Sequence, residues 1–361
     1  MNNKCYVIAE AGVNHNGDLM LARELVDRAA DAGADAVKFQ TFDSAKLVNQ
    51  NAPKASYQKH TTDAAESQLN MLRKLELPRQ WHHELRDRAK SQGIEFLSTA
   101  FDMDSLEFLN SLGMPFYKVP SGEITNGPLL WKFARQRKSL VVSTGMATLS
   151  EVEQALAVIA HGFNADAEPR QVDEVWLGWS KVEWRRSLQG RVTLLHCTSQ
   201  YPTPMHEVNL AAMDTLRHAF GLPVGYSDHT EGILIPLAAV ARGAVLIEKH
   251  FTLDRTMSGP DHLASLEPKQ LALMIREIKL IKIALGDGIK SPQESEWDTR
   301  KAARQQVVVT RDIQVGEIFA RTDLTTTRSG GGMSPMALWG LVGATAERDY
   351  QSGDTVKEIL R

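Results

Sequence analysis

The chain has 361 residues, which is long for one small domain but suits a barrel of about 250 residues with a small appendage. Its 43% apolar and 24% charged residues are ordinary for a globular protein, which excludes extensive disorder. The net charge of −3, from 41 basic and 44 acidic residues, gives no electrostatic basis for binding nucleic acid or an anionic membrane. Any anionic ligand must therefore be held by local charges.

The first residues, MNNKCYVIAEAGVNHNG, lack the apolar centre of a signal peptide, and no stretch reaches the roughly 18–20 apolar residues of a membrane span. Two cysteines, Cys5 and Cys197, each lie within an apolar run. Such positions favour buried free thiols in a reducing compartment over a disulfide. We expect a soluble, cytoplasmic protein.

Short apolar runs alternate with longer amphipathic segments from residue 5 to about residue 285, which is typical of repeated strand–helix units. Eight strands are expected, at residues 6–10, 36–40, 94–99, 116–120, 140–144, 192–198, 223–227 and 245–250. This count predicts a (β/α)8 TIM barrel, although a doubly wound open sheet would give a similar pattern strand by strand.

Two segments interrupt this alternation. Residues 44–70 are polar and of mixed charge, which predicts an active-site loop or lid with at most short helical pieces. Residues 161–190 form an insertion with three tryptophans, which we expect to pack against the barrel wall, with an interface as the alternative.

From about residue 288 the sequence changes to short strand-like runs with glycine turns. We therefore expect a barrel domain over residues 1–287, a linker at 288–300 and a small β-rich domain over 301–361. In that last domain SGGG follows Arg328, either as a flexible turn or as a loop that presents Arg328 to a ligand.

Polar side chains recur at or just beyond the carboxyl ends of the expected strands. They are Glu10, Lys38, Gln40, Thr99, Lys118, Ser121, His196, Ser227, Glu248 and His250. Because a barrel builds its active site at this end, the recurrence predicts a site rather than scattered surface polarity.

Two histidines, His229 and His250, follow consecutive strands and could converge on one divalent cation as neutral donors. Each could instead be a hydrogen-bonded core histidine. Geometry must decide between these alternatives.

Lysines at strand ends are more telling, because a barrel mouth rarely buries an ammonium without a partner. Lys38 and Lys118 could hold a small anion such as a phosphorylated carboxylic acid, together with the hydroxyls of Thr99, Ser121, Ser143 and Ser227. Alternatively the lysines form structural ion pairs with Glu10, Glu123 or Glu248. Both arrangements can coexist.

Several common catalytic motifs are missing from the sequence. It contains no GxxxxGK[ST] loop, no GxGxxG turn after the first strand, no GxSxG elbow and no CxxC pair. The carboxylates of Glu10 and Asp261 are left as candidates to bind sugar hydroxyls or move protons.

At these residues the chain resembles the bacterial N-acetylneuraminate (sialic acid) synthase family, which includes legionaminic acid synthases and joins a barrel to an antifreeze-like SAF domain. The resemblance covers nearly the whole chain except residues 161–190. Its matching blocks are IAEAGVNHNG, GADAVKFQT, ESQLNMLRKLEL, FLSTAFDMDSLEFL, YKVPSGEITNGPLL, STGMATLSEVEQAL, LLHCTSQYPTP, VGYSDHTEGI, IEKHFTLDRTMSGPDHLASLEP and RDIQVGEIFARTDLTTTRSGGGMSPM.

The resemblance implies roles for individual residues. His229 and His250 would bind a divalent metal, Mn²⁺ first, with Mg²⁺ or Co²⁺ as alternatives. Phosphoenolpyruvate would be bound by Lys38, Thr99, Lys118, Ser121, Ser143, Ser199 and Ser227. The sugar would be surrounded by Glu10, Gln40, Tyr201, Asp261 and Arg328. Since Arg328 would come from a partner subunit, a domain-swapped homodimer is expected.

Two positions depart from the family pattern. Ser199 stands where many sialic acid synthases carry Asn, so the hold on phosphoenolpyruvate differs in detail. Ser329 follows Arg328 where the last domain usually has Pro, which loosens that loop without removing the guanidinium.

The implied activity is an aldol-like condensation of phosphoenolpyruvate with N-acetylmannosamine and water, giving N-acetylneuraminate and phosphate. In it Glu10, Lys38, Lys118, His229 and His250 would be catalytic. The alternative is an N,N'-diacetyllegionaminate synthase that uses 2,4-diacetamido-2,4,6-trideoxymannose. A carbohydrate- or ice-binding module with an inactive barrel is the alternative from another class, and the full set of strand-end polar residues argues against it.

Overall fold

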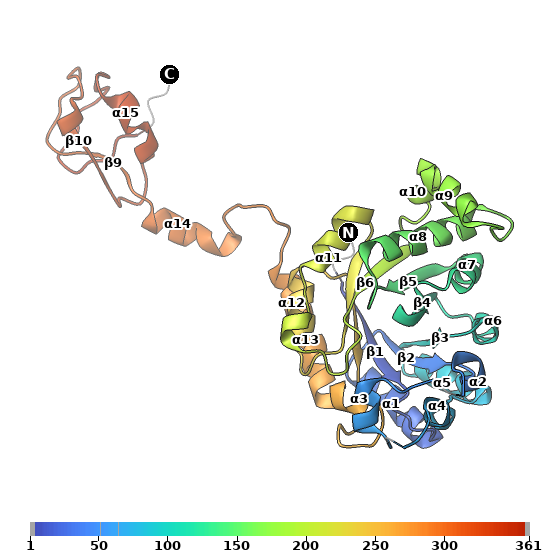
Figure 1. Ribbon diagram of the computed structural model, residues 1–361. Helices are drawn as coiled ribbons and strands as arrows, with labels where there is room; N and C mark the ends of the chain where they lie inside the picture. The colour runs from blue at the N-terminus through green and yellow to red at the C-terminus, as the bar shows by residue number, and fades with distance from the viewer. Residues whose placement is uncertain (1–3, 51, 64, 358–361) are drawn as a thin grey trace. The chain divides into compact units, whose positions relative to one another are not determined.

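The computed structural model describes residues 4–50, 52–63 and 65–357. The chain divides into two compact units, residues 1–286 and 287–361 (Figure 1). The predicted linker, residues 288–300, lies within the second unit.

The first unit is a barrel of parallel strands. Its eight-stranded sheet runs in the order β3-β2-β1-β8-β7-β6-β5-β4, and the end strands β3 and β4 contact each other. The strands are β1 (Tyr6–Gly12), β2 (Ala36–Thr41), β3 (Glu95–Ala100), β4 (Phe116–Val119), β5 (Ser139–Ser143), β6 (Val192–His196), β7 (Val224–Asp228) and β8 (Leu246–His250). All eight predicted strands and the TIM barrel are confirmed, and the open-sheet alternative is wrong.

Helices follow the strands and surround them (Figure 1). The helices of this unit are α1 (Leu19–Asp31), α2 (Ser44–Leu47), α3 (Ser56–Thr61), α4 (Gln68–Leu75), α5 (Arg79–Ser91), α6 (Met103–Ser111), α7 (Gly127–Arg135), α8 (Leu149–Asn164), α9 (Val172–Ser180), α10 (Val182–Arg186), α11 (Ala212–Phe220), α12 (Leu234–Ala241) and α13 (Pro268–Ala284). Side chains cap the N-termini of several of these helices. Asp18 caps α1, Asp102 caps α6, and Thr148 forms a capping box at α8.

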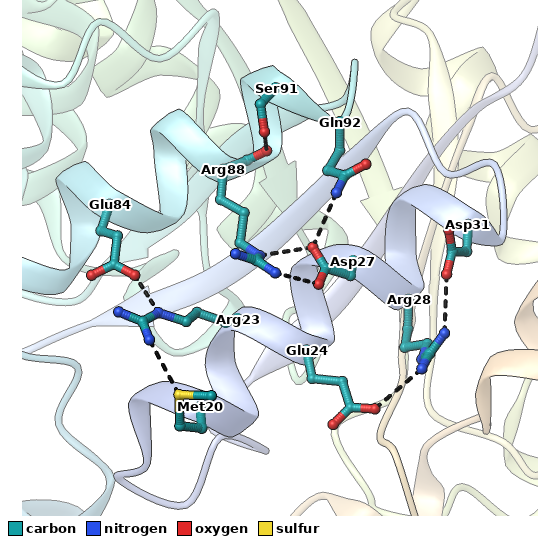
Figure 2. Close-up of polar contacts among 10 residues, drawn as sticks. All are labelled: Met20, Arg23, Glu24, Asp27, Arg28, Asp31, Glu84, Arg88, Ser91 and Gln92. Atoms are coloured by element: carbon teal, nitrogen blue, oxygen red, sulfur yellow. Dashed lines mark hydrogen bonds and ion pairs between the residues drawn. The ribbon is translucent and has the colours of Figure 1, made fainter.

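Polar contacts tie the neighbouring helices α1 and α5 together on the outside of the barrel (Figure 2). The Arg88 guanidinium donates to both carboxylate oxygens of Asp27, at 2.7 and 2.5 Å, and Arg23 donates to Glu84. Exposed pairs of this kind add little stability singly, but a bidentate fork fixes geometry. The two helices are thereby held beside β2, which lies between β1 and β3.

The segment after β2 contains the short helices α2 and α3 and is followed by α4, in agreement with the predicted loop with helical pieces. The buried Lys54 side chain anchors it, since its ammonium donates to Thr62 Oγ1 at 3.0 Å and to the Asp63 carbonyl at 2.8 Å. Glu66 lies 3.8 Å from the same ammonium. We call residues 44–75 the lid.

The tryptophan-rich insertion forms the end of α8 together with α9 and α10. Trp179 and Trp184 pack against the barrel core, and the Trp179 indole donates to Glu153 at 2.9 Å. Trp176 is 37% exposed. The expected packing against the barrel is therefore confirmed for Trp179 and Trp184.

The second unit has its own apolar core, in which Val307, Phe319, Leu324 and Tyr350 are buried. Its strands β9 (Gln306–Val309) and β10 (Leu324–Thr327) pair antiparallel, and its helices are α14 (Trp297–Ala303) and α15 (Leu338–Leu341). The small antiparallel sheet agrees with the predicted β-rich character. Assignment to the SAF type rests on the resemblance alone.

Both cysteines are free and buried, as expected. Within the described residues, no helix combines the length and the apolar character needed to cross a membrane.

Candidate active site

A cavity of about 470 Å³ lies at the carboxyl ends of the barrel strands. Every barrel residue that was predicted to bind a substrate or a metal lines it. These residues are Glu10, Lys38, Gln40, Thr99, Lys118, Ser121, Ser143, Ser199, Tyr201, Ser227, His229, His250 and Asp261. They come from distant parts of the chain, and closure of the barrel brings them together.

The end of β1 is shaped by a bulge at Gly12. The pairing of β1 with β2 shifts register between Glu10 and Gly12, and Gly12 has φ +53°, a conformation that favours glycine. A Cβ atom there would lie 3.4 Å from Glu10, Gln40 and His250. Because these are ordinary contact distances, the positive φ rather than a lack of space favours glycine at this position.

Two lysines and two glutamates form a buried ionic network on the cavity floor. The Lys38 ammonium lies 2.6 Å from Glu10 Oε2 and 3.5 Å from Glu248 Oε2, and it donates to Thr99 Oγ1 at 2.8 Å. Lys118 donates to Glu248 Oε1 at 2.9 Å. Both lysines thus form the ion pairs that were the alternative to anion binding, and they line the cavity as well.

The two glutamates that share Lys38 differ in acidity. Burial raises the pKa of Glu10 to about 7, against the attraction of Lys38. Burial also disfavours the Glu248 anion, but Lys118 and Lys38 together hold the pKa of Glu248 well below its usual range. Glu10 can therefore exchange a proton near neutral pH, whereas Glu248 stays ionised.

Hydroxyl groups gather over the ends of β4 to β7. Ser121 Oγ accepts a hydrogen bond from the Gly145 amide at 3.0 Å and lies 3.2 Å from Cys197 Sγ. A Cβ atom at residue 145 would lie 2.4 Å from Ser199 Oγ, so only glycine permits this close packing. The buried Ser143 hydroxyl has no hydrogen-bond partner among the described residues. This side of the cavity is rich in potential donors to an anion.

Ser227 belongs to the same side but is already engaged, since its hydroxyl donates to Glu248 Oε1 at 2.8 Å. Glu123 also lines the cavity and accepts from the Asn126 side chain at 2.7 Å. Glu123 makes none of the ion pairs that the described residues form with Lys38 or Lys118, so Glu10 and Glu248 are the two of the three named glutamates that pair with these lysines.

The two predicted metal ligands lie side by side, with the ring centroids of His229 and His250 5.4 Å apart. The Tyr201 ring packs on His229 at 4.1 Å between centroids. Burial lowers the pKa of His229 to about 4 and holds the pKa of His250 well below its usual range. Both imidazoles are therefore neutral at pH 7, which is the form that binds metals.

The nitrogen atoms of this pair fit a divalent cation. His229 Nδ1 contacts the Thr198 carbonyl at 2.7 Å, which leaves Nε2 for another partner. His250 Nδ1 is buried without a hydrogen-bond partner in the described structure. No group of three or more His, Cys, Asp or Glu suited to a metal occurs among the described residues, so the pair would be completed by water or substrate.

Asp261 lies beside this pair, with its Oδ2 atom 3.5 Å from His250 Nδ1. Burial, and then repulsion by Glu10, raises the pKa of Asp261 to about 7. A second carboxyl group of the cavity therefore titrates near neutral pH.

Arg328 belongs to the second unit, where it is exposed in the loop after β10. Its predicted contact with a sugar stays a prediction.

The sequence assigned no ligand role to Glu248, although the structure puts it at the centre of the ionic network. The spacing of the two residues could have predicted this position. Side chains alternate along a strand, so Glu248 shares the inner face of β8 with His250. The lid residues Gln58 and Gln68, which also line the cavity, had no comparable signal in their polar surroundings.

Known proteins resemble this chain over most of its length. The family model described as "NeuB family" matches residues 25–290. The N,N'-diacetyllegionaminic acid synthase of Campylobacter jejuni is 48% identical over 98% of this chain and 99% of its own length. The enzyme of the same name from Legionella pneumophila is 44% identical over 98% of this chain and 93% of its own length.

A solved structure, the N-acetylneuraminic acid (sialic acid) synthetase of Leptospira borgpetersenii, superposes with a TM-score of 0.68 at 35% identity. The superposition covers 83% of this chain and 91% of that one. These relatives confirm the predicted class of enzyme, a nonulosonate synthase. The match to the family model and the extent of the similarity to these relatives establish that the chain belongs to the NeuB family.

Proposed function

We propose that this chain condenses phosphoenolpyruvate with 2,4-diacetamido-2,4,6-trideoxymannose and water, giving N,N'-diacetyllegionaminate and phosphate. The observation that carries the proposal is one cavity lined by two lysines, a row of serine hydroxyls, two neutral imidazoles and a carboxyl group of pKa about 7. Such a site offers charge for an anion, donors for its oxygens and a group for proton transfer.

The choice of sugar is supported by the relatives. Those that are 48% and 44% identical are named as diacetyllegionaminic acid synthases, whereas the N-acetylneuraminic acid synthetase is 35% identical. N-acetylmannosamine, the sugar first expected from the sequence, therefore becomes the second candidate.

Phosphoenolpyruvate would occupy the lysine and hydroxyl side of the cavity. Lys118 with Ser121, Ser143 and Ser199 offers donors to phosphate oxygens, whereas the Ser227 hydroxyl donates to Glu248 and lines the same side. Lys38 with Thr99 suits the carboxylate. With Glu10 protonated, two ammonium groups face only the Glu248 carboxylate, so the floor carries a net positive charge that attracts the substrate.

The reaction forms one carbon–carbon bond. The methylene carbon of phosphoenolpyruvate attacks the aldehyde carbon of the open-chain sugar. The neighbouring carbon, which bears the phosphate oxygen, becomes an oxocarbenium centre, and water adds to it. Phosphate then leaves with the former enol oxygen. Lys118 and the serine hydroxyls stabilise the departing phosphate, and Glu10 moves a proton near the sugar.

His229 and His250 would hold a divalent cation, with Mn²⁺ preferred over Mg²⁺ and Co²⁺. When bound, the ion supplies Lewis acidity to the aldehyde oxygen. Tyr201 packs on His229 and keeps the imidazole in place.

Phosphate release tests the proposal. We expect phosphate to be released from phosphoenolpyruvate when a mannosamine-type sugar and Mn²⁺ are both present, and much less when either is left out. Release at the same rate without sugar, or none with either sugar, would reject the proposed condensation. Full turnover after rigorous chelation would remove the metal from it.

A further inference from the structure

We propose that an apolar wall on the lid side of the cavity determines sugar specificity by selecting a substrate whose far end is deoxygenated. We call Phe42, Leu47, Met71, Leu72, Leu75 and Phe101 the lid wall. This inference rests on the proposed function, because it concerns the sugar that is condensed.

The lid wall is one packed surface. Its members belong to a single apolar cluster, separate from the barrel core, and all of them line the cavity. The rings of Phe42 and Phe101 meet edge to face at 6.1 Å between centroids. Leu47, Leu72 and Phe101 are only partly buried, so they have surface left for a ligand to cover.

The wall divides the cavity into two sides of different chemistry. Phe42 follows β2 and Phe101 follows β3, whereas the hydroxyls of Ser121, Ser143 and Ser227 lie at the ends of β4, β5 and β7. No charged side chain from the described part of the lid lines the cavity. A phosphate therefore fits the side of β4 to β7. The surface beyond the ends of β2 and β3, past Lys38 and Thr99, suits apolar groups.

This division orients the sugar. Its aldehyde must meet the enol carbon near His229 and His250, which follow or end β7 and β8. In the barrel order β8 is followed by β1, β2 and β3. A sugar chain that starts at the histidines and avoids the phosphate side therefore extends across β1 and β2, and its far carbons reach the lid wall.

The chemistry of the wall then distinguishes sugars. N-acetylmannosamine would present its C6 hydroxyl to hydrocarbon, where the hydroxyl loses its bonds to water without replacement. A 6-deoxy sugar presents a methyl group instead. Apolar pockets reject an added hydroxyl by about 10- to 100-fold, which sets the expected preference.

The side-chain amide of Gln68 can form the hydrogen bonds that a second acetamido group needs. It lines the cavity at the start of α4, and its amide has no hydrogen-bond partner among the described residues. A primary amide both donates and accepts, as does an acetamido group. We assign Gln68 to the second acetamido group of the sugar.

The test compares three sugars with wild-type enzyme and variants: the diacetamido-trideoxy sugar, N-acetylmannosamine and its 6-deoxy analogue. Wild-type enzyme should prefer the 6-deoxy analogue over N-acetylmannosamine by about 10- to 100-fold in kcat/KM. Leu72→Asn should lower the ratio of kcat/KM for the 6-deoxy analogue to kcat/KM for N-acetylmannosamine by at least about fivefold, because the amide can bond the C6 hydroxyl. It should leave the KM for phosphoenolpyruvate unchanged. Leu47→Asn, at the end of a short helix, gives the same test if Leu72→Asn folds poorly.

Leu69→Asn is the matched control, because Leu69 lies on the same helix but does not line the cavity. It should leave the ratio unchanged. Gln68→Leu should lower use of the diacetamido sugar about tenfold relative to the 6-deoxy analogue, since one amide partner is lost.

An equal use of the two N-acetylmannosamine sugars by wild-type enzyme, or an unmoved ratio in both asparagine variants, would overturn the role of the lid wall alone. Absence of phosphate release with all three sugars would instead defeat the proposed function, and the inference with it.

Discussion

The buried glutamates Glu10 and Glu248 illustrate what single residues contribute. Each needs a cation to be buried, and each contacts Lys38. The sequence could predict that these side chains face the barrel mouth, because alternation along a strand is local. It could not predict which glutamate pairs with which lysine, since those distances depend on closure of the barrel.

The role of Lys118 can be tested by a neutral side chain of similar length. Lys118→Met should lower kcat/KM for phosphoenolpyruvate about 10- to 100-fold, because a charge-assisted hydrogen bond of about 1.5–3 kcal/mol is lost. Stability should change less, because Glu248 keeps Lys38 and Ser227 as partners. Steady-state kinetics and urea unfolding measure both.

Lys74→Met is the matched control for that variant. Lys74 is an exposed lysine of the lid that pairs with Glu66 at 2.7 Å and does not line the cavity. Equal kinetics for Lys118→Met and wild type would remove Lys118 from the site.

Buried histidines predict how stability depends on pH. Burial lowers the pKa of both His15 and His82 from 6.5 to about 4. Between those values the unfolded chain binds more protons at these two positions, so the contribution of each histidine to stability is full above pH 6.5 and is lost as the pH drops towards 4. At pH 5 each histidine should cost roughly 1–2 kcal/mol of unfolding free energy.

Urea unfolding of wild type and variants at pH 7.5 and pH 5 isolates this contribution, because the raised pKa values of Glu10 and Asp261 change wild-type stability in the opposite direction. His82→Gln should reduce it, whereas His206→Gln should not, because the His206 side chain is 82% exposed. An unchanged pH dependence in His82→Gln would contradict the assignment.

At the scale of elements, the eight strands were predictable because strands buried on both faces are continuous apolar runs with polar ends. The apolar side of the lid was not predictable. Leu47 lies on one short helix, and Met71 and Leu72 lie on another, across a stretch that is polar on average. Only the folded lid gathers them into one surface.

A fully buried ion pair joins β7, which His229 follows, to β8, which ends at His250. Lys249 lies 2.6 Å from Asp228, and the two residues are register partners of β8 and β7. Lys249→Met should lower the free energy of unfolding by about 3–5 kcal/mol, since it leaves a buried carboxylate without its cation. Chemical denaturation measures the change.

The double variant Asp228→Leu with Lys249→Met removes both charges and should be more stable than Lys249→Met alone. Arg276→Met, which breaks an exposed pair with Glu277, should change stability by less than about 1 kcal/mol. Strictly additive losses in the double variant would contradict a coupled pair.

At the scale of the whole molecule, the two units have separate apolar cores. The change of pattern near residue 288 allowed two domains to be expected. The partner of Arg328 could not be worked out in this way, because neither local periodicity nor strand ends report on contacts between subunits.

Replacing Arg328 tests most sharply whether a residue of the second unit contributes to sugar binding. If it donates to an N-acyl oxygen of the sugar, Arg328→Ala should lower kcat/KM for the sugar about 10- to 100-fold and leave the KM for phosphoenolpyruvate unchanged. Arg304→Ala, which also removes an exposed arginine of this unit, should have no such effect.

If the donor comes from a partner subunit, mixing Arg328→Ala with Lys118→Met should restore activity, because one hybrid site keeps both residues. Failure of subunits that demonstrably exchange to complement one another would count against the domain-swapped dimer.

The central claim, condensation of phosphoenolpyruvate with the diacetamido-trideoxy sugar, is tested most directly by a competition. Wild-type enzyme is given phosphoenolpyruvate, Mn²⁺ and equal amounts of that sugar and N-acetylmannosamine. The two nine-carbon products are then identified and quantified by mass spectrometry. We predict N,N'-diacetyllegionaminate in about 10- to 100-fold excess over N-acetylneuraminate, with one phosphate released per molecule formed. An excess of N-acetylneuraminate, or the absence of either nine-carbon acid, would contradict the claim.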